Sequence, residues 1–220
     1  AGRRILDRGL RIGGLGDRRF QAYEAAFPYV MRFMVDRDIT SGGWVELPKG
    51  KYTIRPENKK MTRCQLEVDI DANDLIPHAA EGEWAKFAPL RVLSFDIECS
   101  SRENKFPEAE HDAVIQIANV VQCVGQNDPM IKNVFTLKGC APIAGSEVIS
   151  SEQERELLLK WREFVDIVDP DILTGYNICN FDLPYLINRA SALKIHKFPY
   201  LGRIKSSRST LKESTFSSRA

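Results

Sequence analysis

Two carboxylates, Asp96 and Glu98, close a strongly apolar segment of the sequence, RVLSFDIEC. In a β-strand, residues two apart point to the same face, so both acids would project together. Burying two like charges is costly unless a cation compensates them, and Mg²⁺ and Mn²⁺ prefer clustered oxygen ligands of this kind. The pair indicates a divalent metal site, and a solvated strand end is the plain alternative.

A third acid, Asp182, stands in the first turn of a segment with helical character, NFDLPYLINRASAL. The helix macrodipole favours an acid there by ~0.3–1 kcal/mol, which would explain Asp182 without any function. The same corner also holds Asn177 and Phe181, directly after a short predicted strand. Because α/β folds place ligand sites where strands end, we predict that Asp182 joins Asp96 and Glu98 in one site.

Three strands are predicted ahead of this corner. Apolar runs cover residues 91–99, 113–124 and 131–138, and the first is so continuous that it indicates burial on both faces. The turn residues 127–129 separate the second run from the third. This order predicts an antiparallel meander.

Two helices are predicted to follow. The segment 151–169 repeats apolar residues at helical intervals, and Ser151 and Glu154 have the spacing of a capping box. The second helix begins near Asp182, with Asn180 as its predicted cap. Strands, helix, strand and helix in this order indicate an α/β layer fold with a mixed sheet over residues 89–220.

Residues 1–88 have a different character, and we predict a separate, mostly β segment there. Runs at 29–36, 44–52 and 63–70 are of β type, whereas residues 3–12 resemble the end of a helix whose start is missing. The segment also carries a basic run, which we interpret as a solvated hairpin face rather than a phosphate-binding patch. Its members are Lys49, Lys51, Arg55, Lys59, Lys60 and Arg63.

Composition excludes several classes of protein. The 220 residues carry a formal net charge of +1, which argues against a protein that simply coats DNA. The five cysteines show no CxxC spacing, which argues against a zinc or iron–sulfur site. Their odd number favours reduced thiols inside the cell. We expect no membrane association, because no apolar stretch is long enough to span a bilayer.

Two longer strings carry a resemblance to a known family. VLSFDIECS resembles the first exonuclease motif of family B DNA polymerases, and TGYNICNFDLPYL resembles the second. The likeness runs from about Arg3 to the last residues. It implies an RNase H-like 3′→5′ proofreading exonuclease domain that binds DNA at the primer 3′ end. In the longer polymerase it also implies DNA-templated synthesis in the nucleus, with accessory subunits and a sliding clamp.

The resemblance also implies roles for single residues. Two divalent metals, Mg²⁺ or Mn²⁺, would occupy the site, and Asp96 would bridge both. Glu98 would hold the metal that activates water, and Asp182 would serve the second metal, partly through water. Asn177 and Phe181 would contact the frayed single-stranded primer end, although an aromatic side chain at 181 fits a hydrophobic core equally well.

The sequence departs from the family pattern after Asp182. The third exonuclease motif, Tyr-x-x-x-Asp, does not occur, because neither Tyr185 nor Tyr200 is followed by an acid four residues later. The paired polymerase aspartates and C-terminal cysteine clusters are also absent. We therefore expect an incomplete piece of a polymerase, inactive alone, with Trp161, Leu186 and Ile187 partly uncovered. The alternatives are a non-catalytic nucleic-acid-binding module, a stand-alone exonuclease and a structural fragment.

Overall fold

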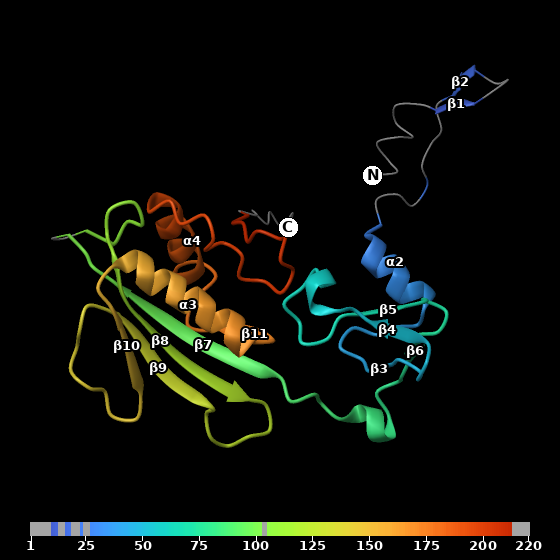
Figure 1. The fold of residues 1–220 in the computed structure, drawn as a ribbon, viewed down its shortest axis with the longest axis horizontal. Helices are drawn as coiled ribbons and strands as arrows, with labels where there is room; N and C mark the ends of the chain where they lie inside the picture. Colours follow the sequence, from blue (N-terminus) through green and yellow to red (C-terminus); the bar gives the residue numbers. More distant parts are fainter. Residues whose placement is uncertain (1–9, 13–15, 19–22, 24–26, 103–104, 213–220) are drawn as a thin grey trace, which may run out of the picture. The chain divides into compact units, whose positions relative to one another are not determined.

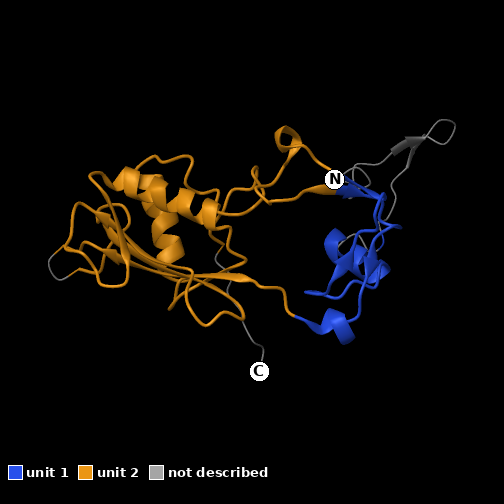
Figure 2. Cartoon of the chain, turned by 60° about the horizontal axis from the view of Figure 1, so that its bottom comes forward, with its two compact units in different colours: residues 1–53, 69–86 blue, residues 54–68, 87–220 orange. Residues whose placement is uncertain are grey.

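The computed structural model describes residues 10–12, 16–18, 23, 27–102 and 105–212. Figure 1 shows the chain, and Figure 2 colours the two compact units into which it divides. Unit 1 comprises residues 1–53 and 69–86, and unit 2 comprises residues 54–68 and 87–220. The predicted helix end at residues 3–12 falls mostly outside the described residues, but its last part, β1 (Leu10–Ile12), is a strand that pairs with β2 (Gly16–Arg18).

Unit 2 is built on one five-stranded sheet, in the order β10-β9-β8-β7-β11. The three long strands β7 (Arg91–Cys99), β8 (Val114–Cys123) and β9 (Ile131–Leu137) form the predicted antiparallel meander. Two short strands are added in parallel, β10 (Glu147–Ser151) beside β9 and β11 (Ile172–Thr174) beside β7. The sheet is therefore mixed, as predicted, although no strand was expected at β10.

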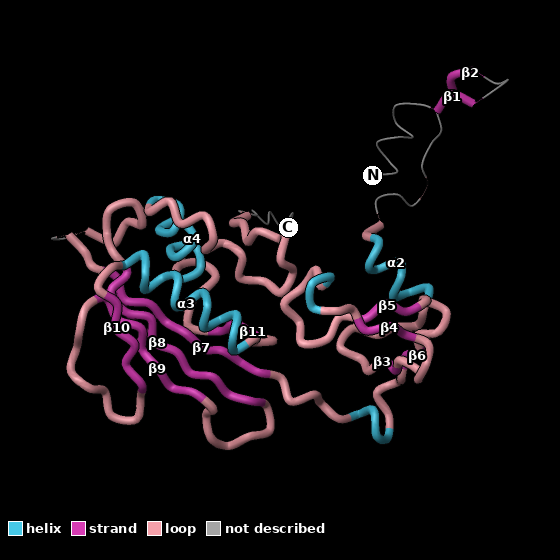
Figure 3. The backbone as a smooth tube through the Cα atoms, in the orientation of Figure 1, coloured by secondary structure: helices cyan, strands magenta, loops and turns pink. Residues whose placement is uncertain are grey.

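Two helices, α3 (Glu154–Val168) and α4 (Asp182–Ala192), pack together over one face of this sheet (Figures 1 and 3). Trp161 of α3 is fully buried, and its Nε1 donates a hydrogen bond of 2.9 Å to the side-chain oxygen of Asn119 on β8. Leu186 of α4 is also fully buried. The expectation that Trp161 and Leu186 would be partly uncovered is therefore wrong, because the two helices and the sheet enclose them. Ile187, the third residue of that prediction, is half-buried.

Strand β7 buries only one of its faces. Leu93, Phe95 and Ile97 point into the core, whereas Asp96 and Glu98 are exposed on the other face. The prediction of a strand buried on both faces is wrong. Its apolar run combines a core face with a second face on which Val92 and Ser94 are only half-buried, a difference that composition alone does not reveal.

The predicted capping box at the start of α3 does not form. The helix begins after Gln153, with no side-chain cap, and the buried Ser151 hydroxyl has no hydrogen-bond partner within the described part of the chain. Glu154 instead accepts a hydrogen bond of 2.8 Å from the backbone N–H of Val114 and pairs through both carboxylate oxygens with the guanidinium of Arg189 on α4. This ion pair connects β8, α3 and α4, so a tertiary contact outcompetes the local cap.

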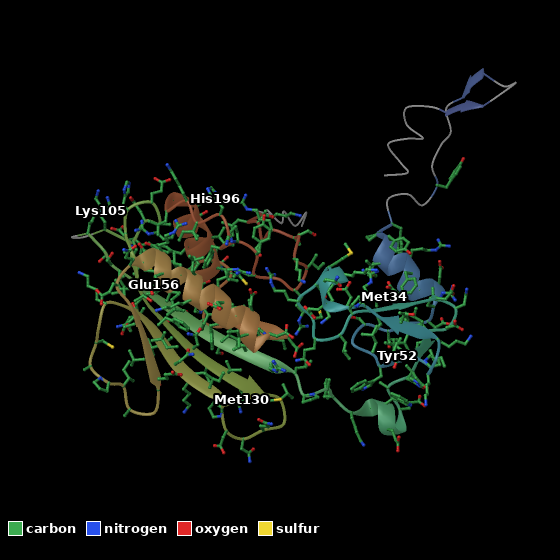
Figure 4. The ribbon with its side chains drawn as sticks, viewed as in Figure 1. Met34, Tyr52, Lys105, Met130, Glu156 and His196 are labelled. Atoms are coloured by element: carbon green, nitrogen blue, oxygen red, sulfur yellow. The ribbon has the colours of Figure 1, made fainter. Side chains whose placement is uncertain are left out.

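The described part of unit 1 contains the α-helix α2 (Tyr29–Asp36) and short strand pairs (Figures 1 and 4). β3 (Val45–Glu46) pairs with β6 (Ile76–Pro77) within this unit. β4 (Tyr52–Ile54) pairs with β5 (Val68–Ile70), and each of these two strands has residues in both units. Residues 29–36 were predicted as a strand, and that prediction is wrong. Methionines and an ion pair between Arg32 and Asp36, one helical turn apart, favour the helix there.

No side chain of unit 1 is buried among those whose burial the structure describes. Its largest aromatic group is a cluster in which the His78 ring stacks on Trp84, with centroids 3.6 Å apart, and Trp44 lies beside Trp84. Trp44 donates its Nε1 hydrogen to the Lys86 carbonyl. Within the described part of the chain, no helix of either unit is both long enough and apolar enough to cross a membrane.

The Glu154–Arg189 ion pair generates a prediction about stability. Both side chains are about nine-tenths buried, at 10% and 9% exposure. Replacing Glu154 with Ala would leave the Arg189 charge uncompensated, so we expect the free energy of unfolding to fall by about 3–5 kcal/mol. Chemical denaturation followed by circular dichroism measures this change.

The matched control is Glu156→Ala on the same helix. Glu156 forms an exposed pair with Lys160, and such pairs contribute less than about 1 kcal/mol. Figure 4 labels Glu156 on α3. Equal losses of stability in the two variants would contradict the role given to Glu154.

Candidate active site

The two acids of β7 project together from its exposed face. Asp96 pairs with Ala118 and Glu98 with Gln116 in the antiparallel register with β8, and the register shifts directly after Glu98. The alternation that buries Phe95 and Ile97 places both acids on the opposite side of the strand. The predicted orientation of the pair is therefore what the strand geometry produces.

Asp182 reaches the same place from the first turn of α4. Its carboxylate accepts a hydrogen bond of 3.0 Å from the backbone N–H of Ile97, the residue between Asp96 and Glu98. The side chain is 1% exposed, so this bond also satisfies a buried carboxylate oxygen. One side chain thus connects the start of α4 to the strand that carries the other two acids.

A pocket of about 370 Å³ contains all three acids, and we call it the acid pocket. Asn177 and Phe181 also line it, so the five residues singled out in the sequence come together in one cavity. Its lining residues are Asp96, Ile97, Glu98, Cys99, Phe106, Pro107, Tyr176, Asn177, Phe181 and Asp182.

Electrostatic repulsion is built into the acid pocket. Burial raises the pKa of the Asp182 carboxyl, the backbone hydrogen bonds from Ile97 and from Asp182 itself partly oppose this, and the charges of Asp96 and Glu98 raise the pKa further. Burial also raises the pKa of the Cys99 thiol to about 11. Cys99 therefore remains a neutral thiol near pH 7.

A tight turn holds the corner between β11 and α4. Asn177 adopts a left-handed backbone conformation (φ 55°), which asparagine tolerates better than most residues. Its carbonyl accepts hydrogen bonds from the backbone N–H groups of Asn180 and Phe181, and its side-chain oxygen accepts one from the Asn180 amide. The predicted capping of α4 by Asn180 is wrong, since this side chain binds Asn177 instead.

Phe181 belongs to both the pocket and the adjacent core. Its ring lies 5.4 Å from Phe106 and 5.5 Å from Tyr185 between centroids, and it is half-buried. Tyr185 is buried, whereas Phe106 is exposed. Both interpretations of Phe181, as core residue and as exposed contact surface, are therefore compatible with its position.

Gly175 permits the close approach of this corner to β7. A Cβ atom at residue 175 would lie 2.3 Å from the carbonyl oxygen of Phe95 and 2.4 Å from a methyl carbon of Ile178. β11 runs parallel to β7 up to the pair Thr174–Ser94, and Gly175 then lies close against the Phe95 carbonyl of β7. Only glycine fits between Thr174 and the turn that leads to Asp182.

Residues 20–220 match the family model described as DNA polymerase family B, exonuclease domain. The chain belongs to this family. The prediction of an RNase H-like exonuclease domain with a mixed sheet is confirmed by this match and by the fold.

The similarity to family B polymerases extends to individual proteins. The chain is 58% identical over 217 residues to the DNA polymerase delta catalytic subunit of Arabidopsis thaliana, 53% to that of Bos taurus and 44%, over 227 residues, to that of Schizosaccharomyces pombe. Each alignment covers 99% of this chain and 20–21% of the relative. The phrases RFMVDRDI, WVELPKGKY and GYNICNFDLPYL predicted this delta-type likeness from the sequence, and it is confirmed.

A solved structure with a similar fold is that of the family B DNA polymerase from the hyperthermophilic archaeon Pyrobaculum calidifontis. It shares 28% sequence identity with this chain at a TM-score of 0.54. The match covers 83% of this chain and 20% of that polymerase. The chain therefore spans about a fifth of the length of the family B polymerases that it resembles.

Membership in the exonuclease family implies the use of divalent metal, and the acid pocket fits such an ion chemically. Its charged donors are carboxylate oxygens, the ligands of hard cations, and a cation would relieve the repulsion around Asp182. Among the described residues, however, no three His, Cys, Asp or Glu side chains are close enough to form a preassembled metal cluster.

Sequence reasoning missed two aromatic residues of the acid pocket in this family B chain. Tyr176 lies inside the TGYN string and is 92% exposed, so its place in a recognised motif was an available signal. Phe106 comes from the loop between β7 and β8, where no spacing connects it to the acids. Only the folded chain brings Phe106 to the pocket.

The contact at Gly175 predicts a strong effect of a single methyl group. Gly175→Ala would force the β11–α4 corner away from β7, and overpacking of this kind costs about 1–3 kcal/mol. We expect a clear fall in the melting temperature. Gly139→Ala is the matched control, because a Cβ at residue 139 meets no atom within 4 Å. Equal melting temperatures for the two variants would contradict the close approach.

Proposed function

We propose that this chain carries part of the 3′→5′ proofreading exonuclease of a delta-type replicative DNA polymerase. The observation that supports this most directly is the position of Asp182, whose buried carboxylate binds the backbone between Asp96 and Glu98. The acids come from two separate motifs, and their arrival in one pocket matches the chemistry of a metal-dependent nuclease.

Asp96, Glu98 and Asp182 are the metal ligands in this proposal. When bound, two Mg²⁺ or Mn²⁺ ions would supply a water nucleophile of lowered pKa and neutralise charge on the phosphodiester. Asp96 and Glu98 face the solvent-accessible side of β7, where a DNA end can reach them. Asp182 is held in place by the Ile97 amide and cannot rotate without leaving that N–H unpaired.

Asn177 and Phe181 position the substrate in this proposal. The substrate is the single-stranded 3′ end of a primer, released from its template as mononucleotides. An aromatic ring such as Phe181 can stack on a base of any identity, which suits an enzyme that removes all four nucleotides. The turn at Asn177 fixes the edge of the acid pocket against which the strand would lie.

The longer protein, in this proposal, performs DNA-templated DNA synthesis in the nucleus. It would bind primer–template DNA, accessory polymerase subunits and a sliding clamp. Within the chain, residues 89–220 are the exonuclease part and residues 1–88 the neighbouring N-terminal part. Residues 54–68, however, group with unit 2, so the N-terminal part contributes a segment to the compact unit that holds the exonuclease part.

A second candidate function is a non-catalytic module that holds nucleic acid. It is favoured by one observation, the absence of a preassembled three-ligand cluster among the described residues. The two candidates differ in whether Asp96 and Glu98 bind metal and whether that metal supports hydrolysis, and both properties can be measured.

One test of the proposed function uses a complete polymerase that carries this domain. Replacing Asp96 with Asn and Glu98 with Gln removes both charges with little change of shape, so degradation from the 3′ end should fall by a factor of at least ~100. Nucleotide addition should remain nearly unchanged, because it uses other carboxylates. Release of mononucleotides and primer extension are measured on the same labelled duplex, and loss of both would assign Asp96 and Glu98 to the fold.

A second test uses the 220-residue chain by itself. It lacks the acid of the third motif, and a metal with fewer ligands places its water less accurately. We expect negligible degradation of single-stranded DNA in Mg²⁺ and at best a trace in Mn²⁺. Weak Mn²⁺ binding, followed by electron paramagnetic resonance, should persist and disappear in Asp96→Asn. Rapid hydrolysis that vanishes in Asp182→Asn would show instead that the chain is a complete nuclease.

A further inference from the structure

A second pocket of unit 2, of about 420 Å³, is lined almost entirely by basic side chains. We call it the cationic pocket. It combines one residue of the 54–68 segment, one of α3 and four from the chain after α4, where Figure 4 labels His196. Its lining residues are Arg63, Arg162, His196, Lys197, Tyr200 and Lys205. None of them lines the acid pocket.

Arg63 enters this pocket through specific backbone contacts. Its N–H donates a 2.8 Å hydrogen bond to the Arg203 carbonyl, and its guanidinium donates one of 2.7 Å to the Gly202 carbonyl. The neighbouring Thr62 forms an antiparallel bridge with Ile204. Arg63 was expected to lie on a solvated hairpin face, but its side chain is only 23% exposed and is directed to α3. The fold therefore gathers basic residues that are far apart in the sequence.

The positive charge of the pocket is compensated only in part. Asp166 is the one carboxylate paired with its arginines among the described residues, 2.6 Å from Arg162 and 3.4 Å from Arg63. No described carboxylate oxygen lies within 4.0 Å of the Lys197 or Lys205 ammonium group. Four cations therefore share one paired acid, although the formal net charge of the whole chain is +1.

Arg162 lines the cationic pocket and has one donor that is unpaired among the described residues. Its terminal nitrogen binds Asp166, while its Nε–H is buried and has no hydrogen-bond partner among the residues that the structure describes. Leaving a buried donor unpaired is unfavourable, and more so for a charged group. Tyr200 and His196 also line the pocket, and side chains of these two types can donate hydrogen bonds.

We propose that the cationic pocket binds phosphate groups of a nucleic-acid strand, at a place separate from the acid pocket. Guanidinium groups match the geometry of phosphate oxygens, and ammonium groups add charge without demanding one orientation. A local excess of positive charge on a nearly neutral chain attracts a polyanion to one place rather than to the whole surface. The choice of a nucleic acid over another polyanion rests on the proposed function.

The test is binding of a fluorescein-labelled oligo-dT of about 12 nucleotides, within the range of single-strand site sizes, to the whole chain in EDTA and at two salt concentrations. We expect Lys197→Gln/Lys205→Gln to raise the Kd about tenfold. The slope of log K against log salt should decrease by about 1.4, the value for two lost phosphate contacts on a single strand. Both lysines are exposed and lack ion pairs among the described residues, so the fold should tolerate the change.

Arg155→Gln/Lys160→Gln is the matched control. It removes two positive charges from the same unit, on helix α3 but outside the pocket. We expect its Kd to stay within about twofold of the original, whereas Arg162→Gln should weaken binding as the lysine variant does. Equal effects of the control and the pocket variants would overturn the proposal, because binding would then follow net charge alone.

Two further arms test where the strand binds and whether a simpler anion can replace it. The Asp96→Asn/Asp182→Asn variant should still bind the oligonucleotide in EDTA. If this variant loses binding while the variants of the cationic pocket keep it, the strand binds only at the acid pocket, and the inference is overturned. Displacement of the oligonucleotide should require another oligonucleotide. Equal displacement by a poly-glutamate peptide or by thymidine monophosphate would overturn it in favour of a general anion site.

Discussion

The hydrogen bond from the Ile97 amide to the Asp182 carboxylate is the contact on which the candidate active site depends. β11 pairs with β7 only as far as Thr174 and Ser94, so no strand hydrogen bond is available on that edge beside the two acids. The Asp182 carboxylate instead accepts the hydrogen bond from the Ile97 N–H, in the place of a strand carbonyl. Because the carboxylate is buried, its placement is fixed by packing rather than by solvent.

The rest of unit 2 can be understood as support for that contact. Gly175 allows the chain to approach β7 closely, and the turn at Asn177 directs it into α4. α4 is in turn held against α3 and β8 by the buried pair of Arg189 and Glu154. Residues with no chemistry of their own thus determine where the acids lie.

The sequence was sufficient to predict the positions of the three acids and of the central strands, because both depend on short-range patterns. Alternation places Asp96 and Glu98 on one face of a strand, and the strand-to-helix corner brings Asp182 to its end. It was insufficient where partners come from far away. The capping role given to Glu154 failed because Arg189 lies 35 residues later, and Arg63 was misplaced because its contacts lie about 100 residues or more away.

The prediction of a strand at residues 29–36 was wrong for a different reason. In so short a run, Tyr, Val, Met and Phe suit either a strand or the surface of a helix. Length and periodicity could not arbitrate there, and the fold selected the helix. Similarly, the apolar residues of a run such as 91–99 do not indicate which face of the strand will be buried.

The order of the strands has a consequence for how the chain folds. The meander β7–β8–β9 is made of neighbours in sequence, whereas the Ile97–Asp182 bond closes a separation of 85 residues and β11 pairs in parallel across a similar distance. Contacts of long sequence separation form late, since they must first overcome the entropy of closing the chain. We expect the sheet to exist before its acids are assembled, and exchange of the Ile97 amide hydrogen would report when that last step has occurred.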